Sequence, residues 1–402
     1  MKTRHLVMMA LGSAIGTGLF VGSGNAIAVA GPGVLISFLV ACVILLLVMR
    51  AMGEMAAAEP ARGAFSLYAE QAMGRTAGQT LGWLWWVQLV IVIAAEATAA
   101  AQILNEMWPV VPQWLMALVF MVIFTALNLI SVHGGFIPNG FTGVAAALLI
   151  VVFAFGGTEL VVVAAAETEN PKENVVKAIR TIVVRLLVFY IGAVTLMVII
   201  LPWNDETLSS SPFVAVLSEV GLPGAQAVMA IVIVLALLSA LNANLYGASR
   251  MLHSLSSRGY APARYATLSA QGVPRAAVVA SVIVGFLTVG ANYLWPEQLL
   301  GFLLNTIGST VLVVWTLSLI SQIILRRRSD RAGRQLSFRM WGYPYLSYVA
   351  LGLIAMIFVL GFFDPVVRTQ LLLTGSLVVI IAIACKLRTA QKARSASASV
   401  DR

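Results

Sequence analysis

The sequence predicts an all-α, polytopic membrane protein. Three observations lead to this fold class: the apolar composition, the length of the apolar runs and the grouping of the basic residues. Of 402 residues, 60% are hydrophobic and only 10% are charged, and the mean hydropathy is +0.95. Soluble domains average about 25% charged residues. The chain is therefore expected to lie in a bilayer.

Eleven apolar runs approach or exceed the roughly 20 residues that a helix needs to cross the hydrocarbon core. They lie at 6–28, 32–52, 77–104, 112–132, 141–166, 181–203, 224–249, 276–295, 299–325, 343–363 and 367–387. We expect one transmembrane domain over residues 1–387. The remaining residues, 388–402, are expected to form a tail whose Ser- and Ala-rich end is frayed.

The basic residues fall between these runs in six clusters, which hold 24 of the 25 Lys and Arg residues. The clusters span 2–4, 50–75, 172–185, 250–275, 326–339 and 386–402, and only Arg368 lies elsewhere. Short loops rich in Lys and Arg stay in the cytoplasm. Both termini are therefore expected to be cytoplasmic. The net charge of +9 is expected to face anionic membrane lipid and not nucleic acid.

The number of runs between two cytoplasmic clusters must be even, yet three runs separate Arg75 from Lys172. One of the three is thus expected not to cross. The run 112–132 is the one expected not to cross, because it is only about long enough to span the membrane and is bracketed by Pro112 and a pair of glycines. His133 is then expected to be accessible from outside.

No motif indicates an enzyme, a cofactor or a metal site. The chain has no G-x-x-x-x-G-K-[ST] loop, no H-E-x-x-H and no cluster of Cys or His. Cys42 and Cys385 lie inside apolar runs at opposite ends of the chain, where packing explains them. Any transport is therefore expected to be driven by a gradient.

Two apolar runs are interrupted by glycine. Gly12, Gly16 and Gly18 interrupt the first run, and Gly156-Gly157 interrupts the run 141–166. Broken helices in transporters expose backbone groups that bind substrate, commonly at the interface of inverted repeats. Close helix packing through small residues is the alternative for the first interruption. Because the second interruption lies in the other half of the chain, a substrate site is favoured over packing.

Only two carboxyl groups, Glu96 and Glu159, lie well inside apolar runs. Burying a carboxylate near the bilayer centre costs about 2.5 kcal/mol or more, so such residues usually serve a function. We interpret both as candidates for proton coupling. A protonated carboxyl group that only bonds a neighbouring helix is the structural alternative.

Many of these residues resemble the bacterial amino-acid permeases of the amino acid–polyamine–organocation superfamily. The similarity runs through Arg4 to Gly24, Ala30 to Pro32, Met49 to Met55, Gly82-Trp83, Pro138 to Phe141, Phe153 to Glu159, Ser249 to Leu252 and Phe338 to Pro344. It covers nearly the whole chain. Within the superfamily it is closest to the 4-aminobutyrate permeases, with proline and aromatic amino-acid permeases as near relatives.

The resemblance implies a fold of five plus five helices in inverted repeats, with two further helices, in the bacterial cytoplasmic membrane. It implies proton symport of 4-aminobutyrate or a neutral amino acid, bound between the broken first and sixth helices. The carboxylate of the substrate would meet Ser13, Ala14, Ile15, Gly16, Thr17 and Gly18. The amino end would meet Phe155, Gly156, Gly157, Thr158 and Glu159, and Glu96 would line or couple the site.

The sequence departs from the family after Val132, where His133 follows directly and the fifth helix is missing. The first repeat, 6–132, is thus incomplete, whereas the second occupies 141–325 and the extra helices 343–387. Three hypotheses stay open. The leading one is a secondary amino-acid permease. The second is a transport-inactive or substrate-binding membrane protein, and the third, a channel, is disfavoured because no pore-loop motif is present.

Overall fold

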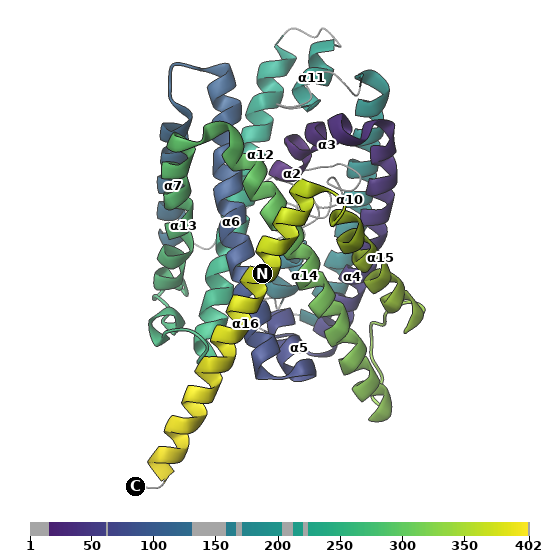
Figure 1. The fold of residues 1–402 in the computed structure, drawn as a ribbon, viewed down its shortest axis with the longest axis vertical. Helices are drawn as coiled ribbons and strands as arrows, with labels where there is room; N and C mark the ends of the chain where they lie inside the picture. The colour runs from purple at the N-terminus through teal and green to yellow at the C-terminus, as the bar shows by residue number, and fades with distance from the viewer. Residues whose placement is uncertain are drawn as a thin grey trace.

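The structure, a computed structural model, describes residues 16–61, 63–130, 158–165, 171–202, 212–219 and 224–400. Within these ranges all regular secondary structure is helical, and the longer helices form a bundle (Figure 1). The all-α, polytopic fold expected from the sequence is confirmed.

The helices follow the apolar runs. In chain order they are α2 (Thr17–Phe20), α3 (Gly22–Ala30), η1 (Gly31–Gly33), α4 (Val34–Ala58), α5 (Ala64–Met73), α6 (Arg75–Met107), α7 (Gln113–Ile130), α9 (Leu160–Ala165), α10 (Pro171–Ile200), α11 (Pro212–Glu219), α12 (Ala225–Ser257), η3 (Ala263–Ala266), α13 (Arg275–Leu294), α14 (Pro296–Arg331), α15 (Tyr345–Gly361) and α16 (Pro365–Val400). In the described part of the chain six helices are long and apolar enough to cross a membrane, and three shorter helical stretches are also apolar. These nine match nine of the eleven predicted runs.

Helix α7 covers the run 112–132, which the sequence predicts not to cross the membrane. It runs beside α6 and α13 (Figure 1), and contacts along its whole length hold it there. These contacts pair Trp114 with Tyr293, Met121 with Gly285 and Asn128 with Asn242. A helix packed lengthwise in the bundle has the place of a crossing helix, which speaks against the expectation that 112–132 does not cross. His133 lies outside the described residues.

Two helices are longer than their apolar runs. Helix α10 begins at Pro171, ten residues before the run 181–203, because proline suits the first turn of a helix and Glu173 and Lys177 form an ion pair one turn apart (3.5 Å). Helix α16 continues to Val400, so the expectation of a frayed tail is wrong. Six of the ten residues 391–400 are Ala, Lys, Arg or Gln, which all favour helix.

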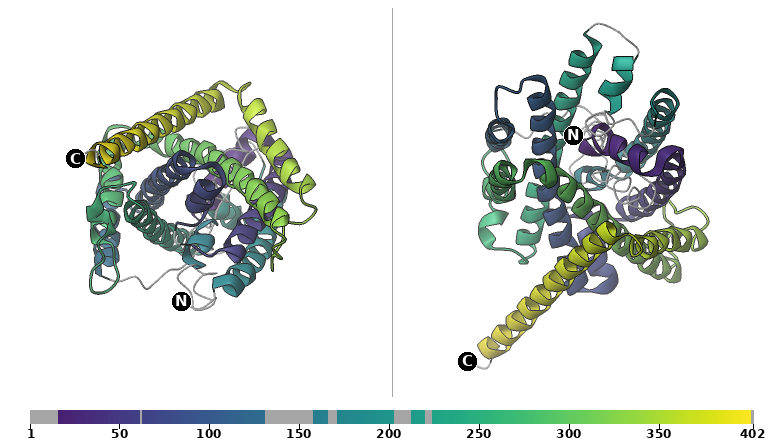
Figure 2. Two further views of the ribbon diagram at one scale, coloured as in Figure 1. Left: turned by 90° about the horizontal axis from the view of Figure 1, so that it is seen from below. Right: turned by 45° about the horizontal axis from the view of Figure 1, so that its top comes forward.

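Helix α6 is the centre of the bundle. In its most apolar 18-residue window 78% of the residues are buried, against 22% in that of α16. Small residues in the second half of α6, such as Ala94, Ala97 and Ala101, let α12 and α14 approach closely. Seen from below, α15 and α16 run along the outer edge (Figure 2). The buried carboxyl group of Glu96 is therefore carried by the most enclosed helix.

Residues of four basic clusters meet at one end of the bundle. The contacts that show this are the ion pair of Arg258 with Glu70 (2.9 Å), the stacking of Arg50 on the ring of Phe338 (3.7 Å to the centroid) and the cavity shared by Lys172 and Arg326. These contacts join segments that lie far apart in the sequence. A single charged end is the arrangement that the cytoplasmic clusters predict.

Candidate functional site

The first glycine interruption directly contacts Glu96. The backbone N–H of Thr17 donates to both carboxylate oxygens of Glu96 (3.1 and 3.0 Å), and the Thr17 hydroxyl donates to Oε2 (2.7 Å). Both side chains are buried. Hydrogen bonds to an ionised carboxylate are about twice as strong as neutral ones. Two segments separated by 79 residues are thus joined at one carboxyl group.

Gly16 is required by this contact. A Cβ atom added at Gly16 would lie 2.0 Å from Oε1 of Glu96, far inside van der Waals distance. Helix α2 then lasts only from Thr17 to Phe20 before Val21 breaks it and α3 begins. The interruption lies where the glycine pattern predicts it. Gly18 is buried in α2, whereas Ser13, Ala14 and Ile15 lie outside the described residues.

The residues that follow the second glycine pair also place a carboxyl group in the core. Thr158 and Glu159 are fully buried and precede α9, whose first turn is closed by Val161 and Val162 donating to their carbonyl groups. The indole N–H of Trp315, on α14, donates to Oε1 of Glu159. The other residues predicted for this segment, Phe155, Gly156 and Gly157, lie outside the described residues.

The two carboxyl groups are connected through packed helices. Glu96 lies on α6, and the indole partner of Glu159 lies on α14, which packs directly on α6. The sequence pointed to both carboxyl groups but not to Trp315. A tryptophan inside the run 299–325 was the available signal, since a buried indole N–H normally finds an acceptor.

The described residues offer no site for a metal. Within the ranges covered by the structure no three His, Cys, Asp or Glu side chains are grouped to hold an ion. What they do offer is a pair of enclosed carboxyl groups, Glu96 beside the interruption at α2 and Glu159 just before α9. Such groups can accept or release a proton, and the amide and hydroxyl of Thr17 can bind a carboxylate.

A bundle of helices that are long and apolar enough to cross a membrane, with two carboxyl groups enclosed in it, has the features of a multi-pass membrane transporter. The sequence model of the family described as amino acid permease matches residues 5–136 and 132–397. The chain therefore belongs to the amino acid permease family.

Named relatives agree with this assignment. The gamma-aminobutyric acid permease of Bacillus subtilis is 37% identical, over 95% of this chain and 92% of its own length. The aromatic amino acid transport protein of Corynebacterium glutamicum is 40% identical over 92% and 90%. The gamma-aminobutyric acid permease of Escherichia coli is 36% identical over 94% and 91%. These relatives are named as permeases or transport proteins and not as enzymes.

The comparisons also show two differences between this chain and its relatives. The family match falls into two parts that meet at residues 132–136. Moreover, the alignment with the aromatic amino acid transport protein of Salmonella typhi extends over 442 positions, although it includes only 98% of the 402 residues here. About 48 aligned positions therefore have no counterpart in this chain, since 98% of 402 is about 394.

Proposed function

We propose that the protein imports 4-aminobutyrate or another neutral amino acid by proton symport across the bacterial cytoplasmic membrane, with both termini in the cytoplasm. Membership in the amino acid permease family supports the transport of an amino acid. The printed names of relatives, which include gamma-aminobutyric acid permeases and an aromatic amino acid transport protein, suggest the range of substrates.

One observation carries the proposed site: the carboxylate of Glu96 is bound by the amide and hydroxyl of Thr17. These are the donors that the carboxylate of an amino acid needs. We propose that Ser13 to Gly18 bind the substrate carboxylate after Glu96 has turned away, and that Phe155 to Glu159 meet the amino end. The two carboxylates then use the same donors in turn, which makes release of Glu96 part of substrate binding.

The proposed coupling uses the same two carboxyl groups. A proton taken up by Glu96 removes the charge that favours its hydrogen bonds to Thr17, and so helps to free them for the substrate. Glu159 is proposed to exchange a proton beside Trp315, close to the amino end of the substrate. The alternative interpretation gives each carboxyl group a structural role only, as a hydrogen-bond partner of a neighbouring segment.

A transport assay separates the proposed function from its main alternative. Purified protein in proteoliposomes should accumulate labelled 4-aminobutyrate, or an aromatic amino acid, when the outside is made acidic, and a protonophore should abolish accumulation. Proteoliposomes without protein serve as the control. If labelled substrate binds but never accumulates against its gradient, the symport proposal is wrong.

A substrate-binding protein without transport is the second candidate function. The two-part family match and the roughly 48 aligned positions without a counterpart support it, because they agree with the loss of a fifth helix. This candidate predicts saturable substrate binding in detergent with no uptake in proteoliposomes. Restoring a helix of a relative between Val132 and His133 should then restore uptake.

A further inference from the structure

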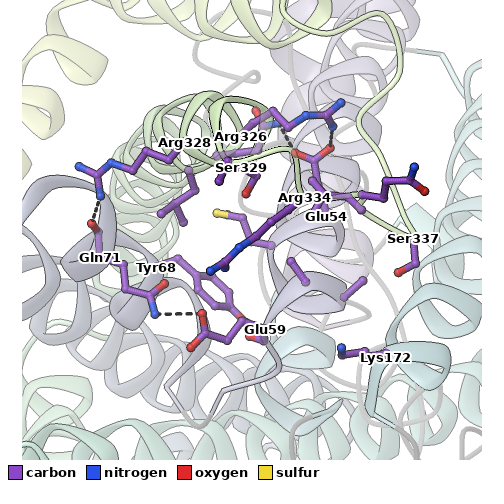
Figure 3. A pocket seen from close by; sticks show the side chains of 18 residues that line it. Glu54, Glu59, Tyr68, Gln71, Lys172, Arg326, Arg328, Ser329, Arg334 and Ser337 are labelled. Atoms are coloured by element: carbon purple, nitrogen blue, oxygen red, sulfur yellow. Dashed lines mark hydrogen bonds and ion pairs between the residues drawn. The ribbon is translucent and has the colours of Figure 1, made fainter.

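A cavity of about 780 Å³ opens at the charged end of the bundle, away from the carboxyl groups of the transport site (Figure 3). Its walls come from the ends of α4 and α14, from α5, from the start of α10 and from the segment after α14. This volume lies within the range of about 300–1,000 Å³ that is usual for small-molecule sites. Nothing in the proposed transport cycle uses it.

The cavity has an excess of positive charge. Four basic side chains line it, Lys172, Arg326, Arg328 and Arg334, against the two carboxylates of Glu54 and Glu59. Two positive charges are therefore in excess. A cavity with this charge favours an anionic ligand.

Two of the four cationic side chains already have protein partners. Arg326 donates to Glu54 (2.7 Å) and to Asp330 (2.8 Å). Arg328 donates to the carbonyl groups of Gln71 and Ala72 (2.5 and 3.0 Å) and so caps the end of α5. These two arginines hold the walls together.

The other two cations, Lys172 and Arg334, make no side-chain hydrogen bond or ion pair within the described part of the chain. In Figure 3 both point into the cavity from different walls, with Arg334 directed toward Tyr68. Glu59, on the same side, accepts a hydrogen bond from Gln71 (3.2 Å). The hydroxyl groups of Ser329 and Ser337 add two further donors to the lining. The cavity therefore offers two cations and two hydroxyl groups to one ligand.

We propose that this cavity binds an anionic phosphate group, with Arg334 and Lys172 as its cationic contacts. The planar guanidinium group of arginine binds phosphate oxygens in pairs, and lysine adds a point charge. The cavity lies at the end that the basic clusters assign to the cytoplasmic, anionic leaflet, where pockets of this kind bind lipid headgroups. An anionic phospholipid is thus the expected source of the phosphate; soluble phosphate has the same chemistry.

The test compares two double variants that each remove two positive charges. Arg334→Gln/Lys172→Gln removes the cavity contacts. Arg331→Gln/Lys386→Gln is the control, because both of its residues are exposed and neither lines the cavity. Full-length protein in neutral detergent is titrated at constant ionic strength with phosphatidylglycerol, with zwitterionic phosphatidylcholine and with inorganic phosphate. The midpoint of thermal unfolding and the binding of a fluorescent phosphatidylglycerol are measured.

We expect phosphatidylglycerol, but not phosphatidylcholine, to raise the unfolding midpoint and to bind saturably. The cavity variant should bind at least about ten-fold more weakly, as expected for the loss of a charged contact worth about 1.4 kcal/mol, whereas the control variant should bind like the parent. An equal response to inorganic phosphate would support the phosphate site and assign it to a soluble ligand. Equal binding by the two double variants, or no response to either anion, would overturn the proposal.

Discussion

Glu54 and Glu96 are both buried carboxyl groups, yet their surroundings differ in kind. Glu54, near the end of α4, accepts hydrogen bonds from Arg326 (2.7 Å), Gln322 (2.7 Å) and the backbone of Met340 (2.6 Å). Glu96, in the second half of α6, accepts its hydrogen bonds from the amide and hydroxyl of Thr17.

The difference separates a structural carboxylate from one suited to change its state. The charge of Glu54 is balanced by the guanidinium group of Arg326, so losing it would leave this half-buried cation with Asp330 as its remaining ion-pair partner. The hydrogen bonds of Glu96 come from neutral groups. It can therefore gain a proton or turn away without leaving a charge behind, which is the property that substrate exchange and proton coupling need.

The largest expected effect comes from filling the space beside Glu96. Gly16→Val should weaken amino-acid binding by roughly 100-fold, about 3 kcal/mol, because its side chain would occupy the position of the Glu96 carboxylate. Equilibrium binding of labelled substrate measures this, and the amount of protein in the membrane should stay normal. Gly301→Val is the control, since no atom lies within 4 Å of a Cβ added there. A variant at Gly16 that binds as tightly as the parent would mean that the site lies elsewhere.

The next effect concerns folding. Glu54→Gln should destabilise the protein by about 3 kcal/mol, because Arg326 keeps only its exposed partner Asp330. Glu96→Gln should cost about 1 kcal/mol, since an amide oxygen still accepts from Thr17. Thermal unfolding in detergent compares the two variants. Equal losses of stability would remove the distinction between the two carboxyl groups.

This distinction was only partly visible in the sequence. The apolar runs predicted the helices, and the glycine pattern predicted the interruption beside Gly16, because those signals are local. The predicted interruption at Gly156-Gly157 lies outside the described residues. Glu54 was not predicted to be a buried carboxyl group, since a carboxylate near a helix end looks like an ordinary surface charge. Its burial depends on Arg326 and Met340, nearly 300 positions away, which no local pattern reveals. The three runs between Arg75 and Lys172 are a similar case, because counting charges shows that one segment is irregular but not which one.

Trp315→Phe should have a smaller effect on transport. It removes the indole donor to Glu159 but keeps an aromatic ring in the core. A lost hydrogen bond to a charged group costs about 1.5–3 kcal/mol, so uptake should fall at least about ten-fold. Trp85→Phe is the matched control, because the indole nitrogen of Trp85 is buried without a partner among the described residues. Similar uptake by both variants would show that Trp315 serves packing alone.

The smallest expected effect on uptake comes from a labelling experiment that tests whether α7 crosses the membrane. In a Cys42→Ala/Cys385→Ala background, a cysteine at Ile130 should leave uptake unchanged and react with a thiol reagent from the cytoplasmic side. That outcome follows if α6 leaves the cytoplasm and α7 returns to it, as their side-by-side packing indicates (Figure 1). Labelling only from outside would restore the expectation that this segment does not cross.

Glu96 and Glu159 are proposed to couple amino-acid uptake to protons. The most direct measurement compares two activities of Glu159→Gln in the same proteoliposomes: uptake driven by an acidic exterior, and exchange of labelled for unlabelled substrate without a gradient. Glu159→Gln should lose the driven uptake and keep measurable exchange, since a side chain that cannot ionise still binds substrate but transfers no proton. Undiminished driven uptake in this variant would contradict the claim.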